Sequence, residues 1–249
     1  MTTVTAEIIA DSINEADERI TTMKLRYPRF IHSELMTHRV FSRNARSSRA
    51  VPVKTMIEEI ERDPAMPLVW GKNQSGMQAR EKLDFFDSKF CETVWRKAAR
   101  DAIEHARRIP FAHKQIVNRL LEPFAHIDVI VTATEWDNFF ALRCHEDADP
   151  TFRALAENMR RAREGSEPQR CSTGHWHMPF SRDMAESVAR CARVSYGKSA
   201  RSTVADKELM ERLLSSGHWS PFEHQARAEP GARSRNFRGW VQGRSLFDE

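Results

Sequence analysis

His38 to Arg49 reads His-Arg-Val-Phe-Ser-Arg-Asn-Ala-Arg-Ser-Ser-Arg, the most informative stretch of the chain. It gathers guanidinium groups, hydroxyls, an imidazole and an amide within twelve residues. Arginine forks match phosphate oxygens two at a time, and short hydroxyl and amide side chains can complete the donor shell. A solvated arginine-rich loop is the alternative, but the apolar run 30–36 before it indicates a packed element that fixes its place. We therefore expect a phosphate-binding site here.

Two other regions agree with this stretch in pointing to one known pattern. His38-Arg39 is followed after seven residues by Ser47 and then by Arg49, and residues 138–143 read Asn-Phe-Phe-Ala-Leu-Arg. Near the C-terminus, residues 192–196 read Ala-Arg-Val-Ser-Tyr and residues 216–224 read Ser-Gly-His-Trp-Ser-Pro-Phe-Glu-His. Together these segments resemble the signatures of the flavin-dependent thymidylate synthase (ThyX) family.

The order of these segments differs from the usual one. In the typical family chain, the Ala-Arg-Val-Ser and Pro-Phe-Glu-His segments precede a strand, a helix and the His-Arg motif, whereas here they come last. The resemblance therefore predicts a circularly permuted, divergent and phage-like member, which is reasonable if the ancestral termini lie close together on the surface. Two segments, 20–39 and the shorter 236–244, compete for the place of the linking strand and helix.

The resemblance implies an α+β fold, a small and mostly antiparallel sheet packed with several long helices. A single catalytic domain would span residues 1–249. It would consist of a nucleotide-binding block with the His-Arg motif (1–164), a linker (165–180) and a permuted flavin-binding block (181–249). The family is typically homotetrameric with active sites shared between subunits, so we expect a homo-oligomer.

Periodicity and breaker residues predict mostly helices with a few strands. We expect strands at 4–10, 20–27 and 127–131, and helices at 29–38, 83–109, 113–121, 134–143, 151–164, 181–193 and 204–215. Thr134 to Asp137 reads as a capping box, and the helix at 83–109 as amphipathic. Strands near both ends with helices between them favour α+β over a parallel array. Since no dinucleotide-type glycine fingerprint is present, a flavin would not occupy a Rossmann crevice.

Composition restricts the remaining classes. A net charge of +4, 40% hydrophobic and 30% charged residues are ordinary for a globular protein. No apolar run approaches the roughly 20 residues that span a bilayer, so we expect a cytoplasmic protein without a membrane anchor. The scattered cysteines predict no disulfide framework, and Cys171, His175 and His177 lack a fourth ligand for a metal. No nucleic-acid-binding motif accompanies the basic residues, so small phosphorylated ligands are favoured over nucleic acid.

Arg143 is the predicted catalytic residue. By its position alone it could simply complement a helix dipole. The family pattern implies that it contacts the pyrimidine and stabilises the negative charge that develops as C5 becomes nucleophilic, a role worth about 3 kcal/mol for one oxyanion donor. By the same resemblance, Ser47 and Arg49 would hold the nucleotide phosphate, with Arg119 as a further nucleotide-binding candidate or a helix-surface residue.

The resemblance also implies which residues line the flavin. The candidates come from the motif stretch, the helix end and the C-terminal segments: His38, Arg39, Asn44, Asn138, Ser195, His218, Ser220 and Glu223. A structural role after a glycine turn is the alternative for His218 and His224.

Departures from the family pattern gather around the nucleotide pocket. Thr37 stands at the first Arg of the usual Arg-His-Arg, Ala45 replaces a Glu and Ala50 replaces a Tyr. Glu34 takes the place of a Gln that contacts the nucleotide, and Gln242, in the second candidate linking helix, could supply that amide instead. These changes predict that the pyrimidine or its C5 product differs from ordinary thymidylate synthesis.

The leading hypothesis is FAD-dependent C5 methylation of dUMP, a pyrimidine deoxynucleotide monophosphate, with methylenetetrahydrofolate as carbon donor and NADPH as reductant. Hydroxymethylation, or action on dCMP, is the main variant within that class. The competing class is a non-catalytic nucleotide- or nucleic-acid-binding module on the same fold, and a purely structural oligomer is a third.

Overall fold

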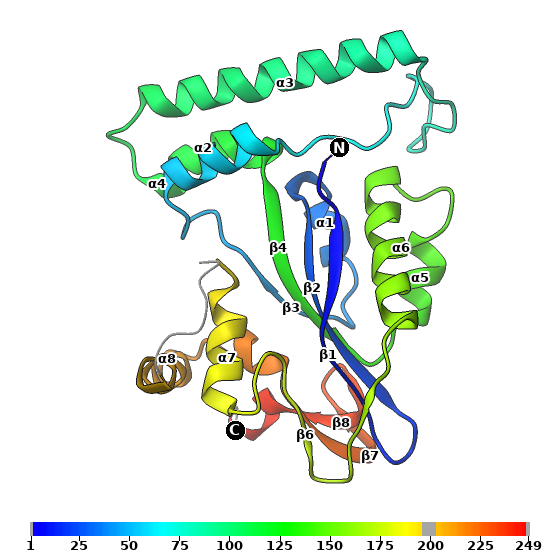
Figure 1. The fold of residues 1–249 in the computed structure, drawn as a ribbon, viewed down its shortest axis with the longest axis vertical. Coiled ribbons are helices and arrows are strands. Elements are labelled where there is room, and N and C mark those ends of the chain that lie inside the picture. Colours follow the sequence, from blue (N-terminus) through cyan, green and yellow to red (C-terminus); the bar gives the residue numbers. More distant parts are fainter. Residues whose placement is uncertain (1, 196–202, 248–249) are drawn as a thin grey trace.

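The computed structural model describes residues 2–195 and 203–247, and its centre is a twisted five-stranded sheet in the order β3-β4-β2-β1-β5 (Figure 1). Neighbouring strands are antiparallel except for β1 and β5, which run parallel. This confirms the predicted α+β class with a mostly antiparallel sheet. The strands are β1 (Thr5–Ile13), β2 (Arg19–Pro28), β3 (Ser42–Ala45), β4 (His126–Ala133) and β5 (Gln169–Arg170).

Strands β2 and β4 lie inside the sheet and are mostly buried. Because alternate side chains of a strand point to opposite faces, these strands contribute apolar residues to both sides of the sheet. Met23 pairs with Val131 and Leu25 with Val129, and these four side chains belong to the largest apolar core. Helices α5 (Asp137–Arg143) and α6 (Pro150–Glu164) cover the sheet face that carries this core. The short α1 (His32–Met36) and the 3₁₀ turn η1 (Arg29–Ile31) also contribute side chains to it. All of these helical segments were predicted, although the helix expected at 29–38 is shorter and begins as a 3₁₀ turn.

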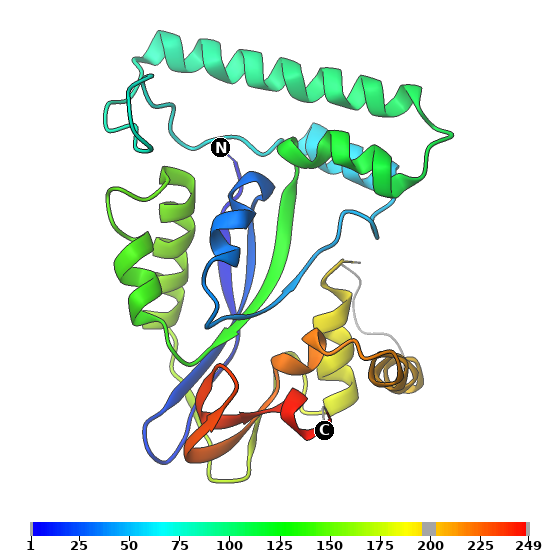
Figure 2. The ribbon, with the colours of Figure 1, turned by 180° about the vertical axis from the view of Figure 1, so that it is seen from behind.

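A second layer of helices lies beyond one end of the sheet, where α3 runs across the molecule in the view from behind (Figure 2). It comprises α2 (Val53–Arg62), α3 (Phe85–Arg108) and α4 (Lys114–Leu121), followed by the 3₁₀ turn η2 (Glu122–Phe124). A separate apolar core joins the three helices through side chains such as Ile57, Ile103 and Leu121. Helices α3 and α4 agree with the sequence prediction, whereas α2 was not predicted.

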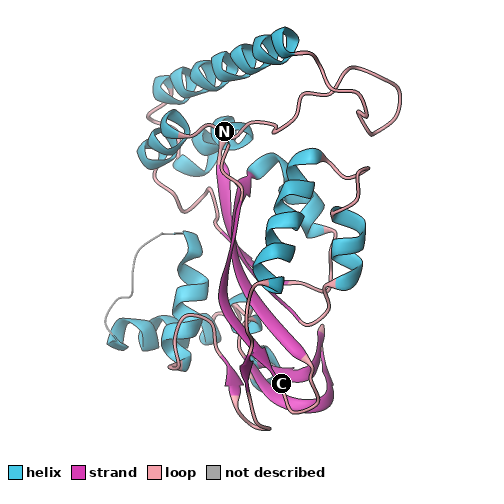
Figure 3. Ribbon diagram, turned by 45° about the vertical axis from the view of Figure 1, so that its right-hand side comes forward, coloured by secondary structure: helices cyan, strands magenta, loops and turns pink. Residues whose placement is uncertain are grey.

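The C-terminal block lies at the end of the main sheet opposite α3, with its helices on the side away from α5 and α6 and its strands below the end of the sheet (Figure 1 and Figure 3). Its strands β6 (Trp176–His177), β7 (Ala226–Ser234) and β8 (Phe237–Gln242) form a three-stranded sheet in that order. Its helices are α7 (Met184–Ala192) and α8 (Thr203–Ser215), with the 3₁₀ turns η3 (Arg193–Ser195), η4 (Ser220–Glu223) and η5 (Gly243–Leu246).

A buried chain of polar side chains attaches this block to the main sheet. His177 accepts or donates through both ring nitrogens, 2.9 Å from Ser12 Oγ and 2.8 Å from Thr22 Oγ1. Thr22 continues to Thr132 at 2.7 Å, and Thr132 to Nδ1 of His224 at 2.8 Å. His224 is thus a buried structural histidine, the role that the sequence left open as the alternative.

The capping box predicted at Thr134 was wrong, and the structure shows which of the two candidate linking segments contains a helix. Thr134 does not cap α5, because the N-cap is Trp136 without a side-chain bond, and Thr134 Oγ1 accepts from the backbone N–H of Arg238 at 3.1 Å instead. Residues 236–244 form β8 and the start of η5, not a linking helix. Residues 20–39 form β2 and α1, which lead directly into the motif. Phe86 and Phe90 of α3 are exposed, and the buried side of that helix carries the small residues Ala99 and Ala106 with Ile103.

Among the described residues, no helix is long and apolar enough to cross a membrane.

Candidate active site

Arg143 ends helix α5, and its guanidinium is the centre of a cluster that unites three predicted site residues. Its Nε donates to Nε2 of His38 at 2.8 Å, and its Nη2 donates to Oγ1 of Thr37 at 3.3 Å. Its Nη1 lies 3.6 Å from a carboxylate oxygen of Glu34. The guanidinium carbon lies 5.0 Å from the centre of the Phe152 ring. Neighbours therefore fix the edges and one face of this cation.

His38 is buried among aromatic rings, 4.9 Å from Phe139 and 5.9 Å from Phe41 between ring centres. Burial, and then the positive charges of Arg143 and Arg43, lower the pKa of His38 to about 4. The ring is therefore neutral at pH 7, as it must be if Nε2 accepts from a guanidinium. Its predicted flavin contact stays a prediction.

Glu34 lies one helical turn before His38, and its side chain is about one third exposed. Burial, and then the nearby carboxylate of Asp149, raise the pKa of Glu34, while Arg143 opposes the change. Asp149 itself is fixed because it caps α6, accepting from the backbone N–H groups of Thr151 and Phe152 at 2.9 Å. A carboxyl group and a guanidinium group thus lie side by side at the same surface.

Strand β3, which the sequence did not predict, carries the middle of the motif. Asn44 of this strand binds the C-terminal block twice: its Nδ2 donates to the carbonyl of Cys191 at 2.7 Å, and its Oδ1 accepts from Ser220 Oγ at 2.8 Å. The structure therefore brings two predicted flavin residues, Asn44 and Ser220, together within one subunit. Both side chains use these contacts to join the two blocks.

Arg43 is a neighbour of this cluster that the sequence did not single out. Its Nη1 donates to the carbonyl oxygens of Leu35, Met36 and His38 at 2.9–3.2 Å. These carbonyls lie at the end of α1 and in the turn after it, where a nearby cation commonly adds a hydrogen bond. Arg43 thus holds the backbone that carries Thr37 and His38. An arginine soon after a short helix was the only available signal.

Gln242 lies at the end of β8 rather than in a helix, and it is buried. Its Nε2 donates to Ser42 Oγ at 3.1 Å and to Asn236 Oδ1 at 2.8 Å. Within the described part of the chain, its Oε1 is one of the few buried polar atoms without a hydrogen-bond partner. Gln242 therefore lies at the end of a strand, not in the helix that the sequence suggested, and its side chain contacts β3.

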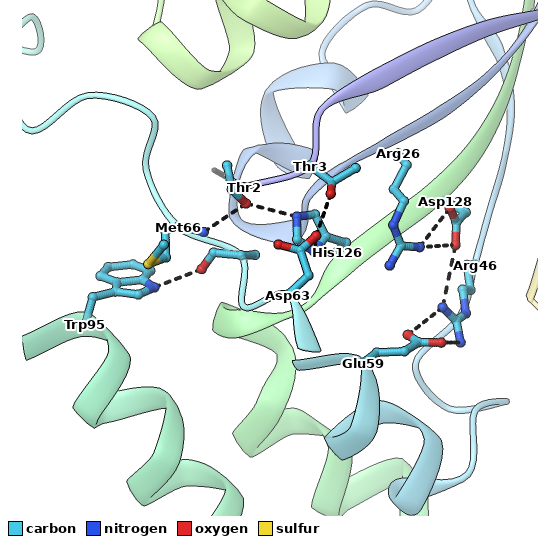
Figure 4. A network of polar contacts seen from close by, with 11 residues as sticks. Thr2, Thr3, Arg26, Arg46, Glu59, Asp63, Met66, Trp95, His126 and Asp128 are labelled. Atoms are coloured by element: carbon cyan, nitrogen blue, oxygen red, sulfur yellow. Dashed lines mark hydrogen bonds and ion pairs between the residues drawn. The ribbon is translucent and has the colours of Figure 1, made fainter. Parts of the chain in front are cut away.

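Ser47 and Arg49 follow β3 on an exposed turn, which a polar network holds at its start (Figure 4). Arg46 forms a two-point ion pair with Glu59 at 2.8 and 2.9 Å and lies 3.5 Å from Asp128. At the end of the turn, Asn118 Nδ2 donates to the carbonyls of Ser48 and Val51 at 2.7 and 2.9 Å.

Arg119 lies beside this same turn. It contacts the carboxylate of Glu122 at 3.1 Å, and Glu122 also accepts from Ser48 Oγ at 2.5 Å. Glu122 thus connects Arg119 to Ser48, the residue between Ser47 and Arg49, after the end of β3, whereas the residues of the Arg143 cluster precede the start of that strand.

The other predicted flavin residues lie apart from one another. Arg39 is exposed in the turn after α1, and His218 is exposed before η4. Asn138 is exposed at the start of α5, where it lines a cavity of about 510 Å³ that also contains Arg19, Arg163 and Arg238. Glu223 pairs with Arg244 at 2.7 Å. Ser195 ends η3, but its side chain lies outside the described residues.

The Cys-His corner does not form a metal site. His177 belongs to the buried polar chain, and no group of three or more potential ligands that could hold a metal exists among residues 2–195 and 203–247.

Comparison with known families shows to which protein family this chain belongs. The model of the thymidylate synthase complementing protein family matches residues 18–169, more than half of the chain. This chain belongs to the ThyX family. The match covers the Arg143 cluster and the turn with Ser47 and Arg49, and it ends before the C-terminal block. The circular permutation of that block stays a prediction.

Solved structures of PolB share the fold of this chain. The UMP/dUMP methylase PolB from Streptomyces cacaoi, bound with 5-Br dUMP, superimposes with a TM-score of 0.55 at 16% identity, covering 65% of this chain and 90% of that one. The PolB complex with 5-Br UMP has a TM-score of 0.54 at 17% identity, covering 65% of this chain and 89% of that one. The structure of ThyX from Helicobacter pylori with FAD and dUMP has a TM-score of 0.40 at 14% identity, covering 59% of this chain and 68% of that one. No curated protein sequence matches significantly.

Proposed function

We propose that this ThyX-family chain methylates C5 of a pyrimidine nucleoside monophosphate, with dUMP as the default substrate, FAD as cofactor, methylenetetrahydrofolate as carbon donor and NADPH as reductant. The observation that carries the proposal is the Arg143 cluster. A guanidinium held in one orientation is the kind of preorganised cation that stabilises charge developing on a ring carbonyl. Family membership and the PolB likeness supply the substrate class.

Exposed donors suited to an anionic dinucleotide lie on separate parts of the chain's surface. Arg39, Asn138 and His218 offer guanidinium, amide and imidazole groups, the donor types that bind a diphosphate and the polar edge of a flavin ring, and an active site shared between subunits would bring such donors together. When bound, FAD would supply the redox chemistry of the reaction. Asn44 and Ser220 would support this surface indirectly, because their side chains bind each other.

Each residue of the nucleotide site then has a role of its own. Ser47 and Arg49 would bind the phosphate, with Arg119 beside them, and Arg143 would bind the pyrimidine. Because β3 lies between these two groups, the strand sets their separation. Arg143 would lower the barrier by about 3 kcal/mol as the ring gains negative charge.

The test is mass spectrometry of dUMP, UMP and dCMP after anaerobic incubation with the protein, FAD, methylenetetrahydrofolate and NADPH. A methyl mass gain on dUMP supports the proposal, and a hydroxymethyl gain would assign the variant reaction. Unchanged nucleotides that nevertheless bind would support the non-catalytic module instead.

Arg143→Lys should lower kcat by about 10²-fold with FAD binding retained, because lysine keeps the charge but loses the planar fork. Arg160→Lys, an exposed arginine of α6, is the matched control and should leave kcat unchanged. Equal effects of both substitutions on kcat would remove Arg143 from the mechanism.

A second candidate substrate is dCMP, and Glu34 favours it. Cytosine presents an amino group where uracil presents a carbonyl oxygen, and a carboxyl group is a natural acceptor for that amine. Glu34 places such a group 3.6 Å from Arg143. Glu34→Gln should therefore shift the kcat/KM ratio of dUMP to dCMP upward by about 10-fold or more. An unchanged ratio would exclude Glu34 from base selection.

We also propose that the chain forms a homo-oligomer, with a tetramer as the family's usual state. Helix α3 supports this, since Phe86, Phe90 and Val94 at successive turns are 81%, 69% and 50% exposed.

A further inference from the structure

We infer that Thr37 and His38 are positioning residues for Arg143, and that this pair sets the direction in which the guanidinium meets the pyrimidine. The inference rests on the proposed function for its kinetic consequence. It assigns to His38 a role toward a side chain 105 residues away, in addition to any contact with a cofactor.

The chemistry of the donors fixes the state of both acceptors. A guanidinium has only donors, so the His38 Nε2 that it contacts at 2.8 Å must carry a lone pair, and the ring proton must lie on Nδ1. Thr37 Oγ1 lies 2.7 Å from the carbonyl oxygen of Glu34, which can only accept, so the hydroxyl proton points there. The hydroxyl oxygen is then left to accept from Nη2 of Arg143 at 3.3 Å.

These contacts occupy one particular side of the guanidinium. Nε and Nη2 form the side fork of arginine, and both are bonded to the Thr37–His38 pair. The end of the group that carries Nη1 is directed toward Glu34, and Phe152 covers one face. A flexible arginine side chain has several rotatable bonds, and here the packing selects one conformation. What faces a ligand is therefore the Nη1 end beside a carboxyl group.

The support of the two positioning residues is itself rigid. The His38 ring is held by Phe41, Phe139 and Phe152, and its backbone carbonyl accepts from Arg43 at 3.2 Å. The charges that face the ring are Arg143 and Arg43, and both disfavour its protonation. The neutral, accepting state of the imidazole is thus the state that the surroundings maintain.

The first test is independent of turnover. In the ¹⁵N-labelled full chain, we expect ring nitrogen shifts that show His38 protonated at Nδ1 and unprotonated at Nε2. Free histidine prefers the other tautomer, so Arg143→Met should move the proton to Nε2. A proton on Nε2 in the unmodified protein, or shifts indifferent to Arg143→Met, would overturn the inference.

The second test compares two amides at position 38. The Gln oxygen can reach the place of Nε2, whereas the shorter Asn reaches only that of Nδ1. Both variants lose the ring, so His38→Asn is the matched control for lost packing. We expect His38→Gln to keep kcat and nucleotide KM within about 5-fold, and His38→Asn to lose about 10²-fold in kcat and to raise the nucleotide KM at least 5-fold more than His38→Gln does. Equal losses would overturn the inference.

Nucleotide binding separates this inference from the proposed function. If no pyrimidine nucleotide is turned over, the proposed reaction fails, but the same variants can still be compared by the Kd of dUMP and dCMP. A Kd that His38→Asn weakens at least 5-fold more than His38→Gln does would support the positioning role without catalysis. Equal Kd values for the two variants would overturn it. Thr37→Ser against Thr37→Val repeats the comparison for the hydroxyl.

Discussion

At the scale of single residues, Asn44 shows how one side chain can join distant parts of the chain. Its amide donates to Cys191 and accepts from Ser220, which lies 176 residues away in sequence. The family resemblance predicted that both Asn44 and Ser220 line the flavin, which stays a prediction. It could not show that they bind each other, because side-chain pairing across such a separation depends on the tertiary fold.

A double-mutant cycle tests this contact. Asn44→Ala and Ser220→Ala should be coupled by about 1 kcal/mol in the free energy of unfolding measured with urea, as expected for one partly buried hydrogen bond. Asn158→Ala removes a comparable amide contact to Val4 far from Ser220, and it should combine additively with Ser220→Ala. Additivity of the Asn44 and Ser220 substitutions would show that the contact contributes nothing.

The same limit applies to Arg143 and its neighbours. The motif spelling drew attention to Arg143, His38 and Glu34 separately. It also treated Thr37 as the loss of a cation, whereas the structure gives this threonine a hydroxyl acceptor for Arg143. When a residue departs from a family pattern, the sequence shows which chemical group is missing, but it does not show what the new side chain contacts.

At the scale of elements, helix α3 illustrates what periodicity can and cannot predict. Apolar residues at spacings of three and four correctly predicted a long amphipathic helix. Periodicity gives the existence of an apolar face but not the surface that covers it. The protein's own core takes the side with Ala99, Ile103 and Ala106, and the phenylalanines face outward. Strand β3 was not predicted because it is short and polar, whereas α2, with Met56, Ile57 and Ile60 on its buried side, has an amphipathic pattern that the prediction missed.

The exposed face of α3 leads to a prediction about assembly. Phe90→Glu should shift the protein to a smaller species in size-exclusion chromatography with light scattering, because a charge would enter the proposed apolar interface. Val204→Glu puts the same charge at a 66% exposed apolar position of α8, away from α3, and as the control it should leave the mass unchanged. A Phe90→Glu protein of unchanged mass would place any interface elsewhere.

At the scale of the whole molecule, buried histidines couple folding to pH. Burial lowers the pKa of His177 to about 4 and that of His224 to about 3, and both belong to the polar chain that attaches the C-terminal block. His32 and His38 are also lowered to about 4. The folded protein thus keeps these rings neutral in a range where the unfolded chain protonates them.

The sign of the effect follows from this difference. The stabilisation that the neutral rings provide is fully present above pH 6.5 and is lost as the pH falls toward 4, because protons then bind the unfolded state preferentially. We expect the free energy of unfolding to decrease below pH 6.5 by about 1.4 kcal/mol per pH unit for each such histidine. Urea unfolding at a series of pH values measures the slope, and a flat profile from pH 6.5 to 5 would contradict it.

The fold class and most elements could be predicted from the sequence. The placement of the C-terminal block against the main sheet could not. Strand and helix patterns, with the family resemblance, predicted the α+β class and most elements. The contact between the motif strand and the C-terminal block depended on which surface that block would cover. The buried chain from Ser12 to His224 decides this, and its five polar members are ordinary residues in sequence.

The bond between Asn44 and Ser220 has a consequence for the synthesis of the protein. A ribosome adds roughly 5–20 residues per second, so the 176 residues between them take roughly 10–35 s to appear. Until then, β3 emerges as a sheet edge whose covering segment has not been translated. The nascent chain therefore exposes the edge of β3 during this time, and the contact between Asn44 and the C-terminal block forms only after Ser220 has left the ribosome.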